Sequence, residues 1–267
     1  MKNKLLLIFL IVFLFATIFF LGSCKNSKKN NPVEIAKFSI EIISRVPHAK
    51  TSFTQGLFYH QGYLYESAGL YKQSSLQKLN ARTGKIEKII PLDASVFAEG
   101  LTLHQDRLYQ LTWKEKKAFA YDLETFALLN TFAYDTDGWG LTSDGEHLIM
   151  SDGSHVLYFR DARTFDIKKN LFVKKYGQPL NYLNELEYVN GYIYANIYQT
   201  DFIAMIDSGS GNVTGMIDAS SLYQHLEHSP KMDVLNGIAY NPESGNFFIT
   251  GKNWPSIFEV RFIRSID

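Results

Sequence analysis

Polar residues that can move protons or polarise a carbonyl recur in short, regularly spaced motifs. Gln55 lies in Phe-Thr-Gln-Gly-Leu, Glu99 in Phe-Ala-Glu-Gly-Leu, Asn184 in Leu-Asn-Glu-Leu-Glu and Lys252 in Gly-Lys-Asn-Trp-Pro. A carboxyl group among aromatic side chains has its pKa raised by desolvation, which suits it to proton transfer near neutral pH. Amide and ammonium groups can hold a developing oxyanion. Together these residues predict acid–base chemistry on an amide or ester carbonyl.

Aromatic residues accompany the polar ones and predict pocket walls that exclude water. The chain has neither a Gly-x-Ser-x-Gly elbow nor a pattern typical of a Ser-His-Asp triad, so no covalent serine nucleophile is expected. The motifs alone leave alternatives open: Trp113 and Trp139 could pack between sheets, and Lys252 could be a surface lysine. Asn236 is interpreted as a residue that holds a turn. The aromatic candidates are Phe53, Phe97, Trp113, Trp139 and Tyr198.

The motifs begin units of similar length, and their successive first residues are 44, 41, 45 and 52 residues apart. In each unit an apolar strand, a turn and a second strand follow, and a turn such as Val189-Asn-Gly191 is typical of a β-hairpin. This period, with several short strands per unit, predicts an all-β fold, a five-bladed β-propeller. The units begin at Phe53, Phe97, Gly138, Leu183 and Leu235.

The two ends of the domain are predicted to pair. The last unit has only three predicted strands and ends near Phe258–Phe262, whereas Lys37–Ile43 alternates like a strand but has no hairpin partner. We expect this N-terminal strand to join the last blade and close the ring, which removes an exposed sheet edge. The loops that enter the innermost strands of a propeller converge at one end of its axis, so the five motifs would meet there. Residues 220–226 predict a short helical turn.

Composition bounds the class of protein. The 267 residues are 46% hydrophobic and 20% charged, as in a folded globular protein. The 27 basic and 27 acidic residues cancel, which argues against a nucleic-acid partner. The 20 Phe, 16 Tyr and 3 Trp exceed what one pocket needs and predict extensive aromatic packing. A single Cys excludes an internal disulfide and a cysteine-based metal cluster.

The N-terminal segment has the pattern of an export signal. Lys2 and Lys4 precede the apolar run Leu5–Leu21, and Leu-Gly-Ser-Cys, ending at Cys24, resembles the bacterial lipoprotein cleavage box. We therefore predict a signal peptide over residues 1–24 that ends at a lipidated Cys24, a flexible tether over 25–36 and the propeller domain over 37–267. The protein would be exported and lipid-anchored to the bacterial cell envelope. The alternative is an ordinary signal anchor with an incidental cysteine.

Eight motifs, in order and with similar spacing, resemble the plant and bacterial type of glutaminyl cyclase, the glutamine cyclotransferase family. The resemblance covers essentially the whole chain after Phe38. It implies a five-bladed β-propeller that converts the N-terminal glutamine of a peptide to pyroglutamate and releases ammonia. The motifs are Phe53–Leu57, Phe97–Thr102, Leu111–Lys114, Gly138–Gly145, Ser151–Ser154, Leu183–Glu187, Ala195–Asp201 and the segment from Leu235–Tyr240 to Thr250–Pro255.

The resemblance also implies roles for single residues. Glu99 would be the proton shuttle, and Gln55, Asn184 and Lys252 would bind and polarise the carbonyl or amide of the substrate. The family commonly has Trp where this chain has Tyr198, so we expect an altered pocket size or rate. The residues that would line the pocket are Phe53, Phe97, Trp113, Trp139 and Tyr198.

Cofactors and partners follow from the same resemblance. No cofactor is required for catalysis, and some members carry a structural calcium, for which no ligands can be assigned here. The animal-type enzymes use zinc on an unrelated fold; the closely spaced His225 and His228 are interpreted as a solvated loop. The expected partner of this monomer is a peptide or protein with N-terminal Gln. The alternative function is a catalytically inactive, lipid-anchored propeller that binds a peptide or small ligand in the same axial cup.

Overall fold

The structure, a computed structural model, describes residues 34–265, so the predicted signal peptide, Cys24 and most of the predicted tether lie outside the described residues. Strands provide nearly all of its regular structure, which confirms the predicted all-β class. The short helix predicted near residues 220–226 is present as the 3₁₀ helix η1 (Ser220–His225). No helix within residues 34–265 has the length and apolar character needed to span a membrane.

Three separate sheets each contain four consecutive strands paired in an antiparallel order. The first comprises β2 (Thr54–His60), β3 (Tyr63–Ala68), β4 (Ser75–Asn80) and β5 (Ile86–Pro91). The second comprises β6 (Ala98–His104), β7 (Arg107–Thr112), β8 (Lys117–Asp122) and β9 (Leu128–Ala133). The third comprises β10 (Leu141–Ser143), β11 (Leu148–Ser151), β12 (Val156–Arg160) and β13 (Ile167–Phe172).

An eight-stranded sheet contains two further groups of four strands. The N-terminal strand β1 pairs antiparallel with β22 from Phe38 opposite Arg264 to Pro47 opposite Ser256, which is the pairing that the sequence predicts. A short parallel pairing of β1 with β19 joins the two groups. The fourth group comprises β16 (Leu183–Val189), β17 (Tyr192–Ile197), β18 (Phe202–Asp207) and β19 (Val213–Asp218). The fifth comprises β20 (Leu235–Asn241), β21 (Asn246–Gly251), β22 (Ser256–Arg264) and β1 (Ala36–Pro47).

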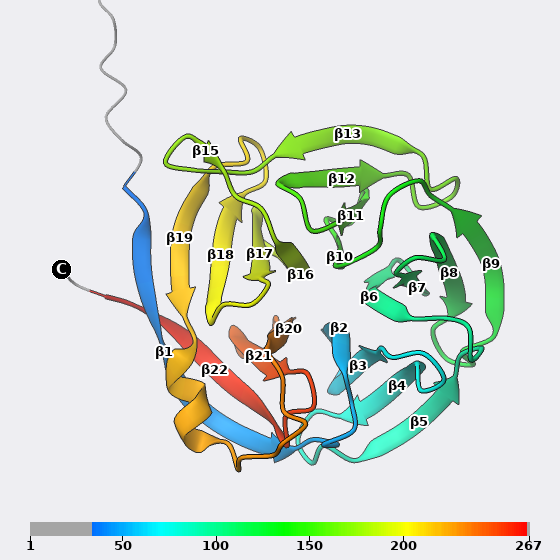
Figure 1. Cartoon of the computed structure of the whole chain (residues 1–267), viewed down its shortest axis with the longest axis horizontal. Coiled ribbons are helices and arrows are strands. Elements are labelled where there is room, and N and C mark those ends of the chain that lie inside the picture. The colour runs from blue at the N-terminus through cyan, green and yellow to red at the C-terminus, as the bar shows by residue number, and fades with distance from the viewer. Residues whose placement is uncertain (1–33, 266–267) are drawn as a thin grey trace, which may run out of the picture. The chain divides into compact units, whose positions relative to one another are not determined.

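The five groups surround a common centre, with their first strands innermost (Figure 1). Each innermost strand contacts the innermost strand of the next group, and β20 contacts β2, so the circuit is closed. The hydrophobic core is divided in the same way: each of the five buried apolar clusters among the described residues takes side chains from two neighbouring groups. Burial between adjacent sheets, rather than inside one layer, therefore stabilises the arrangement.

Glycines of the repeated motif permit this close approach of the innermost strands. A Cβ on Gly56 would meet the backbone of Leu101, and one on Gly100 would meet the backbone of Leu141. In both cases the obstacle is main chain of the next innermost strand, which cannot rotate away. The recurring Gly-Leu of the motifs is thus a packing requirement of the ring, and it fixes where the preceding residues lie.

The outer turns share one type of side-chain to backbone hydrogen bond. A side-chain oxygen at the first position accepts a hydrogen bond from a backbone N–H two or three residues later, as at Asn80, where Oδ1 lies 3.0 Å from the amide nitrogen of Arg82. Such Asx turns are local and depend only on Asn or Asp at that position. The same contact occurs at Asp122, Asp161 and Asp207.

Two insertions explain the unequal spacing of the motifs. A small hairpin, β14 (Lys174–Lys175) and β15 (Gln178–Pro179), precedes the fourth group, and η1 precedes the fifth.

The connection between β10 and β11 differs from the two-residue Asp-Gly hairpin that Ser143-Asp-Gly145 predicts. It spans four residues, with the amide of Asp144 donating to the carbonyl of His147 at 3.2 Å.

Candidate active site

All nine pocket residues singled out by the sequence line one cavity of about 320 Å³. It lies at the entrance to the innermost strands, where the five motifs begin. The structure therefore brings together residues from every group of the ring. The lining residues are Phe53, Gln55, Leu70, Phe97, Glu99, Trp113, Trp139, Asn184, Tyr198 and Lys252.

The polar residues of the motifs lie at shifts in the register between paired strands. The register of β2 shifts between Thr54 and Gly56, at Gln55, and that of β6 shifts between Ala98 and Leu101, at Glu99. Equivalent shifts occur in β16 and β20 at Asn184 and Asn236. Such irregularities leave residues out of the regular ladder and redirect side chains. Three of these four residues, Gln55, Glu99 and Asn184, line the cavity.

Glu99 is a buried carboxyl group, with a residue exposure of 5%. Burial raises its pKa well above the ordinary value, and the neighbouring carboxylates of Glu115 and Asp137 raise it further. The positive charge of Lys252 and a hydrogen bond with Gln55 oppose this shift. A carboxyl group in this state can take up and return a proton near neutral pH.

Gln55 is oriented by Asn236. The Asn236 side-chain nitrogen donates to Gln55 Oε1 at 3.2 Å and to the carbonyl of Thr54 at 3.0 Å. Because this contact occupies the oxygen of the Gln55 amide, its nitrogen is the atom that faces Glu99. Asn236 therefore does form a side-chain to backbone hydrogen bond, but the bond reaches across to the neighbouring innermost strand instead of holding a local turn.

Lys252 enters the pocket between two aromatic rings. Its Nζ lies 4.8 Å from the ring centroid of Phe53 and 5.0 Å from that of Tyr198, and the residue is only 4% exposed. Burial lowers the pKa of Lys252, while the negative charges of Glu99 and Asp233 raise it. The alternative of a surface lysine is thereby excluded. The two rings stabilise the ammonium group without neutralising it.

Asn184 presents an unused acceptor. It is 3% exposed, and its Oδ1 accepts no hydrogen bond from the residues described in the structure. An amide oxygen without a partner costs free energy unless a ligand or water supplies the missing donor. Asn184 can therefore accept a hydrogen bond from an N–H group of a molecule in the pocket.

The aromatic walls form two sets, and the rings within each set are in contact. The ring of Phe97 packs edge-on against Phe53 at 6.2 Å and Trp113 at 5.5 Å, and Trp139 packs edge-on against Tyr198 at 5.4 Å. Trp113 and Trp139 thus line the pocket, while the third tryptophan of the chain is completely buried in the core. The walls can bind an apolar stem and keep water out.

Leu70 is the lining residue that the motifs do not reveal. It follows Gly69, where an added Cβ would lie 2.6 Å from the Phe97 ring and 2.9 Å from Gln55. Leu70 adopts a left-handed backbone with φ of 87°, which is unusual for a branched side chain. Its position therefore depends on loop conformation, for which a leucine gives no sequence signal.

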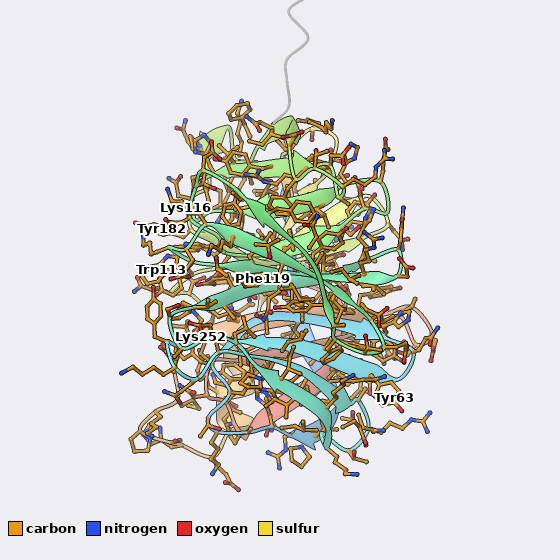
Figure 2. The ribbon with its side chains drawn as sticks, turned by 90° about the vertical axis from the view of Figure 1, so that its right-hand side faces the viewer. Tyr63, Trp113, Lys116, Phe119, Tyr182 and Lys252 are labelled. Atoms are coloured by element: carbon orange, nitrogen blue, oxygen red, sulfur yellow. The ribbon has the colours of Figure 1, made fainter. Side chains whose placement is uncertain are left out.

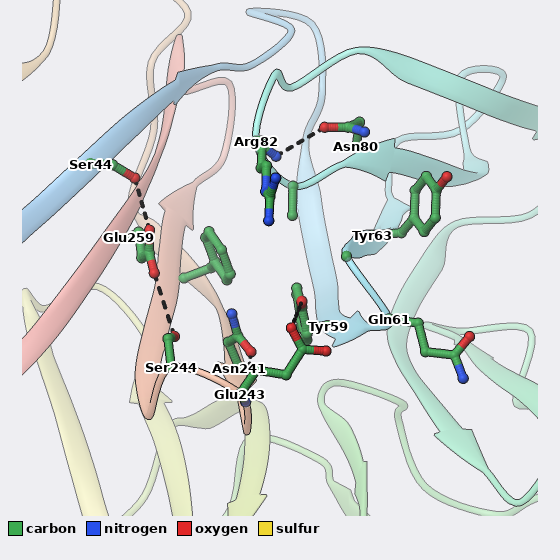
Figure 3. Close-up of a pocket in the computed structure, with 13 residues that line it drawn as sticks. Ser44, Tyr59, Gln61, Tyr63, Asn80, Arg82, Asn241, Glu243, Ser244 and Glu259 are labelled. Carbon is green, nitrogen blue, oxygen red and sulfur yellow. Dashed lines mark hydrogen bonds between the residues drawn. The ribbon is translucent and has the colours of Figure 1, made fainter.

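A second pocket of about 600 Å³ lies at the other end of β2, beside Gln61 and Gly62 (Figure 3). Its acidic groups already have protein partners: the Tyr59 hydroxyl donates to Glu243 at 3.3 Å, and Ser44 donates to Glu259 at 3.0 Å. The two pockets lie on opposite faces of the ring. In side view, Trp113 and Lys252 are on one face and Tyr63 is on the other (Figure 2). The smaller, aromatic cavity is the candidate active site.

The centre of the ring contains buried carboxyl groups that bear on metal binding. Within residues 34–265, no group of three or more His, Cys, Asp or Glu side chains could hold a metal ion. The buried carboxyl group of Glu185 accepts backbone N–H groups at both oxygens, from Leu57 at 3.2 Å and Ile238 at 2.8 Å. Burial raises the pKa of Glu185 well above its usual value. Both oxygens of Glu185 thus already accept a backbone hydrogen bond.

Comparisons with known proteins agree on one family. The family model for glutamine cyclotransferase matches residues 14–262. The chain is 41% identical to a glutaminyl-peptide cyclotransferase of Arabidopsis thaliana over 226 residues, which is 83% of this chain and 71% of that protein. The crystal structure of Myxococcus xanthus glutaminyl cyclase superposes with a TM-score of 0.82 at 39% identity, covering 87% of this chain and all of that one. The chain therefore belongs to the glutamine cyclotransferase family.

Proposed function

We propose that the protein is a glutaminyl-peptide cyclotransferase that converts N-terminal glutamine of peptides or proteins to pyroglutamate and releases ammonia. The observation that carries this proposal is the buried carboxyl group of Glu99 in an aromatic pocket with an ammonium group and two amides. The similarity to the Arabidopsis enzyme, across most of both chains, supports it.

The proposed scaffold is a five-bladed β-propeller. Five four-stranded groups surround one centre, and β1 supplies the fourth strand of the last group. In this architecture each group is a blade, and the pocket occupies one end of the central axis. A rigid ring of this kind places residues that are distant in sequence within reach of one small substrate.

Binding in the proposed reaction relies on shape and on a few polar contacts. The aromatic walls enclose the methylene groups of the glutamine side chain. Lys252 lies against the carbonyl oxygen of the substrate γ-amide, where it stabilises the negative charge that develops during attack. Asn184 Oδ1 accepts a hydrogen bond from the substrate α-amine. These contacts hold the amine beside the amide carbon, which supplies much of the rate enhancement because both groups belong to one residue.

Glu99 carries the proposed proton transfers. The neutral α-amine nitrogen attacks the γ-amide carbon, and the new carbon–nitrogen bond closes the five-membered ring. The Glu99 carboxylate accepts a proton from that nitrogen and then donates it to the departing amide nitrogen. The old carbon–nitrogen bond breaks and ammonia leaves, so Glu99 ends the cycle in its starting state. The Gln55 amide, fixed by Asn236, orients the carboxylate through both transfers.

Ammonia release from a Gln-initiated dipeptide tests the proposed activity. The protein without residues 1–24 is expected to produce ammonia and pyroglutamyl product in equal amounts, and incubation with zinc chelators is expected to leave the rate unchanged because no proposed step uses a metal. An Asn-initiated dipeptide is a matched control, since its shorter side chain places the amide out of reach. Absence of turnover over a broad pH range would favour the alternative, an inactive propeller that binds a peptide.

We also propose that Cys24 carries a lipid anchor that holds the protein at the bacterial cell envelope after export. The resemblance of the preceding residues to a lipoprotein cleavage box supports this. Metabolic labelling with a fatty-acid analogue is expected to mark the wild-type protein and to leave Cys24→Ala unlabelled and absent from the membrane fraction. Equal labelling of the two forms would contradict lipidation at this cysteine.

A further inference from the structure

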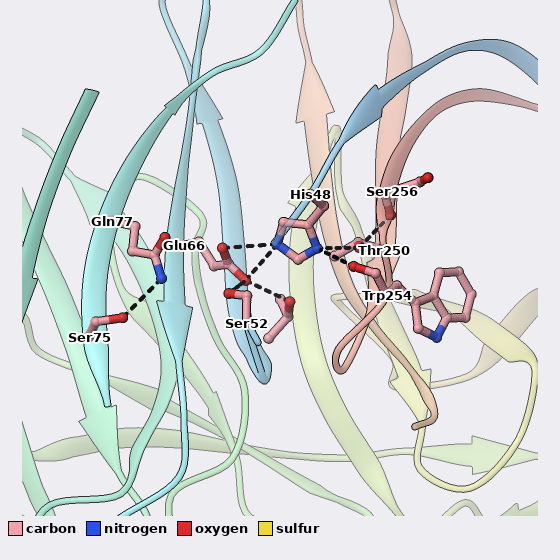
Figure 4. A network of polar contacts seen from close by, with 9 residues as sticks. His48, Ser52, Glu66, Ser75, Gln77, Thr250, Trp254 and Ser256 are labelled. Atoms are coloured by element: carbon pink, nitrogen blue, oxygen red, sulfur yellow. Dashed lines mark hydrogen bonds and ion pairs between the residues drawn. The ribbon is translucent and has the colours of Figure 1, made fainter. Parts of the chain in front are cut away.

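His48 and Glu66 form a buried ion pair, and neither residue lines the pocket. His48 Nε2 lies 3.2 and 3.1 Å from the two carboxylate oxygens of Glu66, and both side chains are completely buried (Figure 4). Removal of two charges from water costs several kcal/mol per ion, so such pairs are weak contributors to stability. The contacts around the pair show instead which parts of the chain it holds.

Glu66 holds the segment that enters β2. The hydroxyls of Ser52 and Thr54 each donate to its Oε1 at 2.6 Å, and Phe53 lies between them. Burial would raise the pKa of Glu66, but the charge and hydrogen bond of His48, together with the two hydroxyls, hold the pKa below its ordinary value. The carboxylate is therefore ionised at neutral pH and fixes the segment on which a pocket wall is built.

His48 holds the turn between β21 and β22. Its Nδ1 donates to the carbonyl of Trp254 at 2.9 Å, and its backbone N–H donates to the carbonyl of Pro255 at 2.9 Å. Burial would lower the pKa of His48, but Glu66 and the Trp254 carbonyl raise it above the ordinary value. Protonation makes both ring nitrogens donors, so one imidazolium connects the carboxylate to the turn.

A third contact joins the same two segments. The backbone N–H of Asn253 donates to the carbonyl of Ser52 at 2.8 Å. Lys252 precedes Asn253, and its ammonium group lies over the ring of Phe53. The ammonium group and the aromatic wall beneath it therefore depend on one set of buried contacts.

We propose that His48 and Glu66 are positioning residues for the cyclisation reaction: they set Lys252 against Phe53 and Glu99 by clamping the turn after β21 to the segment before β2. The inference rests on the function proposed above. A displacement of about 1 Å, even from a mutation far from the chemistry, can cost about 100-fold in rate. The substrate itself never touches the pair.

Glu66→Gln tests the clamp, because glutamine keeps the size of the side chain and one acceptor oxygen but removes the charge. We expect kcat to fall by about 10-fold or more, since misplacement of Lys252 and Phe53 costs rate. KM should change less, because Phe97, Trp113 and Trp139 lie on other segments of the chain.

The matched control is Glu187→Gln, which makes the same change at a half-buried carboxyl group on the innermost strand β16. The Glu187 carboxyl group accepts hydrogen bonds from Thr142 and Tyr240 rather than from the turn. Equal losses of kcat in both variants, in proportion to lost folded protein, would overturn the proposal.

A second readout does not depend on catalysis. Lys252 faces the carboxyl groups of Glu99 and Asp233 and the rings of Phe53 and Tyr198, and burial lowers its pKa. NMR titration of isotope-labelled lysine is expected to show this pKa moving up toward its ordinary value in Glu66→Gln, as the released turn admits water. An unchanged Lys252 titration overturns the clamp. A wild-type protein without cyclase activity would instead contradict the proposed function, and the titration would still decide the positioning role.

A milder double variant covers the case in which Glu66→Gln does not fold. Ser52→Ala with Thr54→Val removes both hydroxyl donors and leaves the ion pair intact. We expect a smaller loss of kcat and a smaller upward shift of the Lys252 pKa, in the same directions. Wild-type values for both quantities in this folded variant would overturn the proposal.

Discussion

Replacement of Glu99 with Gln is expected to lower kcat for a Gln-initiated peptide by about 10²- to 10⁴-fold, the usual contribution of a positioned acid–base group. KM should change little, because the amide preserves the shape of the pocket floor and the aromatic walls remain. The physical reason is specific: glutamine can still form hydrogen bonds, but it cannot accept the proton of the attacking amine. Initial rates of ammonia release over a range of peptide concentrations measure both constants.

Glu187→Gln is the matched control for this prediction. Glu187 is half-buried on an innermost strand, with its Oε1 2.8 Å from the amide nitrogen of Tyr240, and desolvation raises its pKa to about 8. It does not line the pocket, so turnover per folded molecule should match the wild type. If Glu99→Gln retains wild-type kcat, or if both variants lose turnover equally, Glu99 is not the proton shuttle.

Replacement of Lys252 with Met is expected to have two effects. First, kcat should fall by about 10²- to 10³-fold, because the developing oxyanion loses its charged partner. Second, the charge of Lys252 lowers the pKa of Glu99, so its removal raises that pKa further. Because the carboxylate is the form that accepts the proton, the acidic limb of the kcat/KM profile should move to higher pH. A pH series with wild type and variant measures both effects.

Lys78→Met provides a comparison on the opposite face of the ring. The ammonium group of Lys78 lies 4.2 Å from the ring centroid of Tyr63, so the change also removes a lysine from an aromatic ring. Neither residue lines the pocket, and we expect an unchanged rate and an unchanged profile. A shift of the acidic limb to lower pH in Lys252→Met, or the same shift in both variants, would contradict the electrostatic role of Lys252.

Local signals in the sequence predict much of the fold. Turn residues such as Asn190-Gly191 adopt the positive φ values that a tight hairpin requires, with 49° and 88°. The unpaired strand pattern at Lys37–Ile43 lies within β1 and pairs with β22, because an alternating strand with one apolar face needs a sheet edge. Periodicity and turn chemistry act over a few residues, so they can be recognised without knowledge of tertiary contacts.

The sequence predicts the composition of the pocket better than its supports. Glu99, Gln55 and Lys252 stand in recurring motifs, whereas His48 and Glu66 occur in strands and connections without a motif, and their pairing depends on the closure of the ring. The role of Asn236 escapes the sequence for a similar reason. Its amide could satisfy its own turn or a neighbouring strand, and only the distance between adjacent innermost strands decides which.

The central claim is that Glu99 is the acid–base group, and its own titration tests this most directly. NMR of the labelled Glu99 carboxyl carbon in the free protein, set beside the pH dependence of kcat/KM, compares the residue with the kinetics. The account predicts a Glu99 pKa well above the ordinary value that coincides with a pKa of the kinetic profile, and that is missing from the profile of Glu99→Gln. A Glu99 carboxyl group with an ordinary pKa would contradict the account. So would a kcat/KM profile with no pKa that matches the Glu99 pKa measured by NMR.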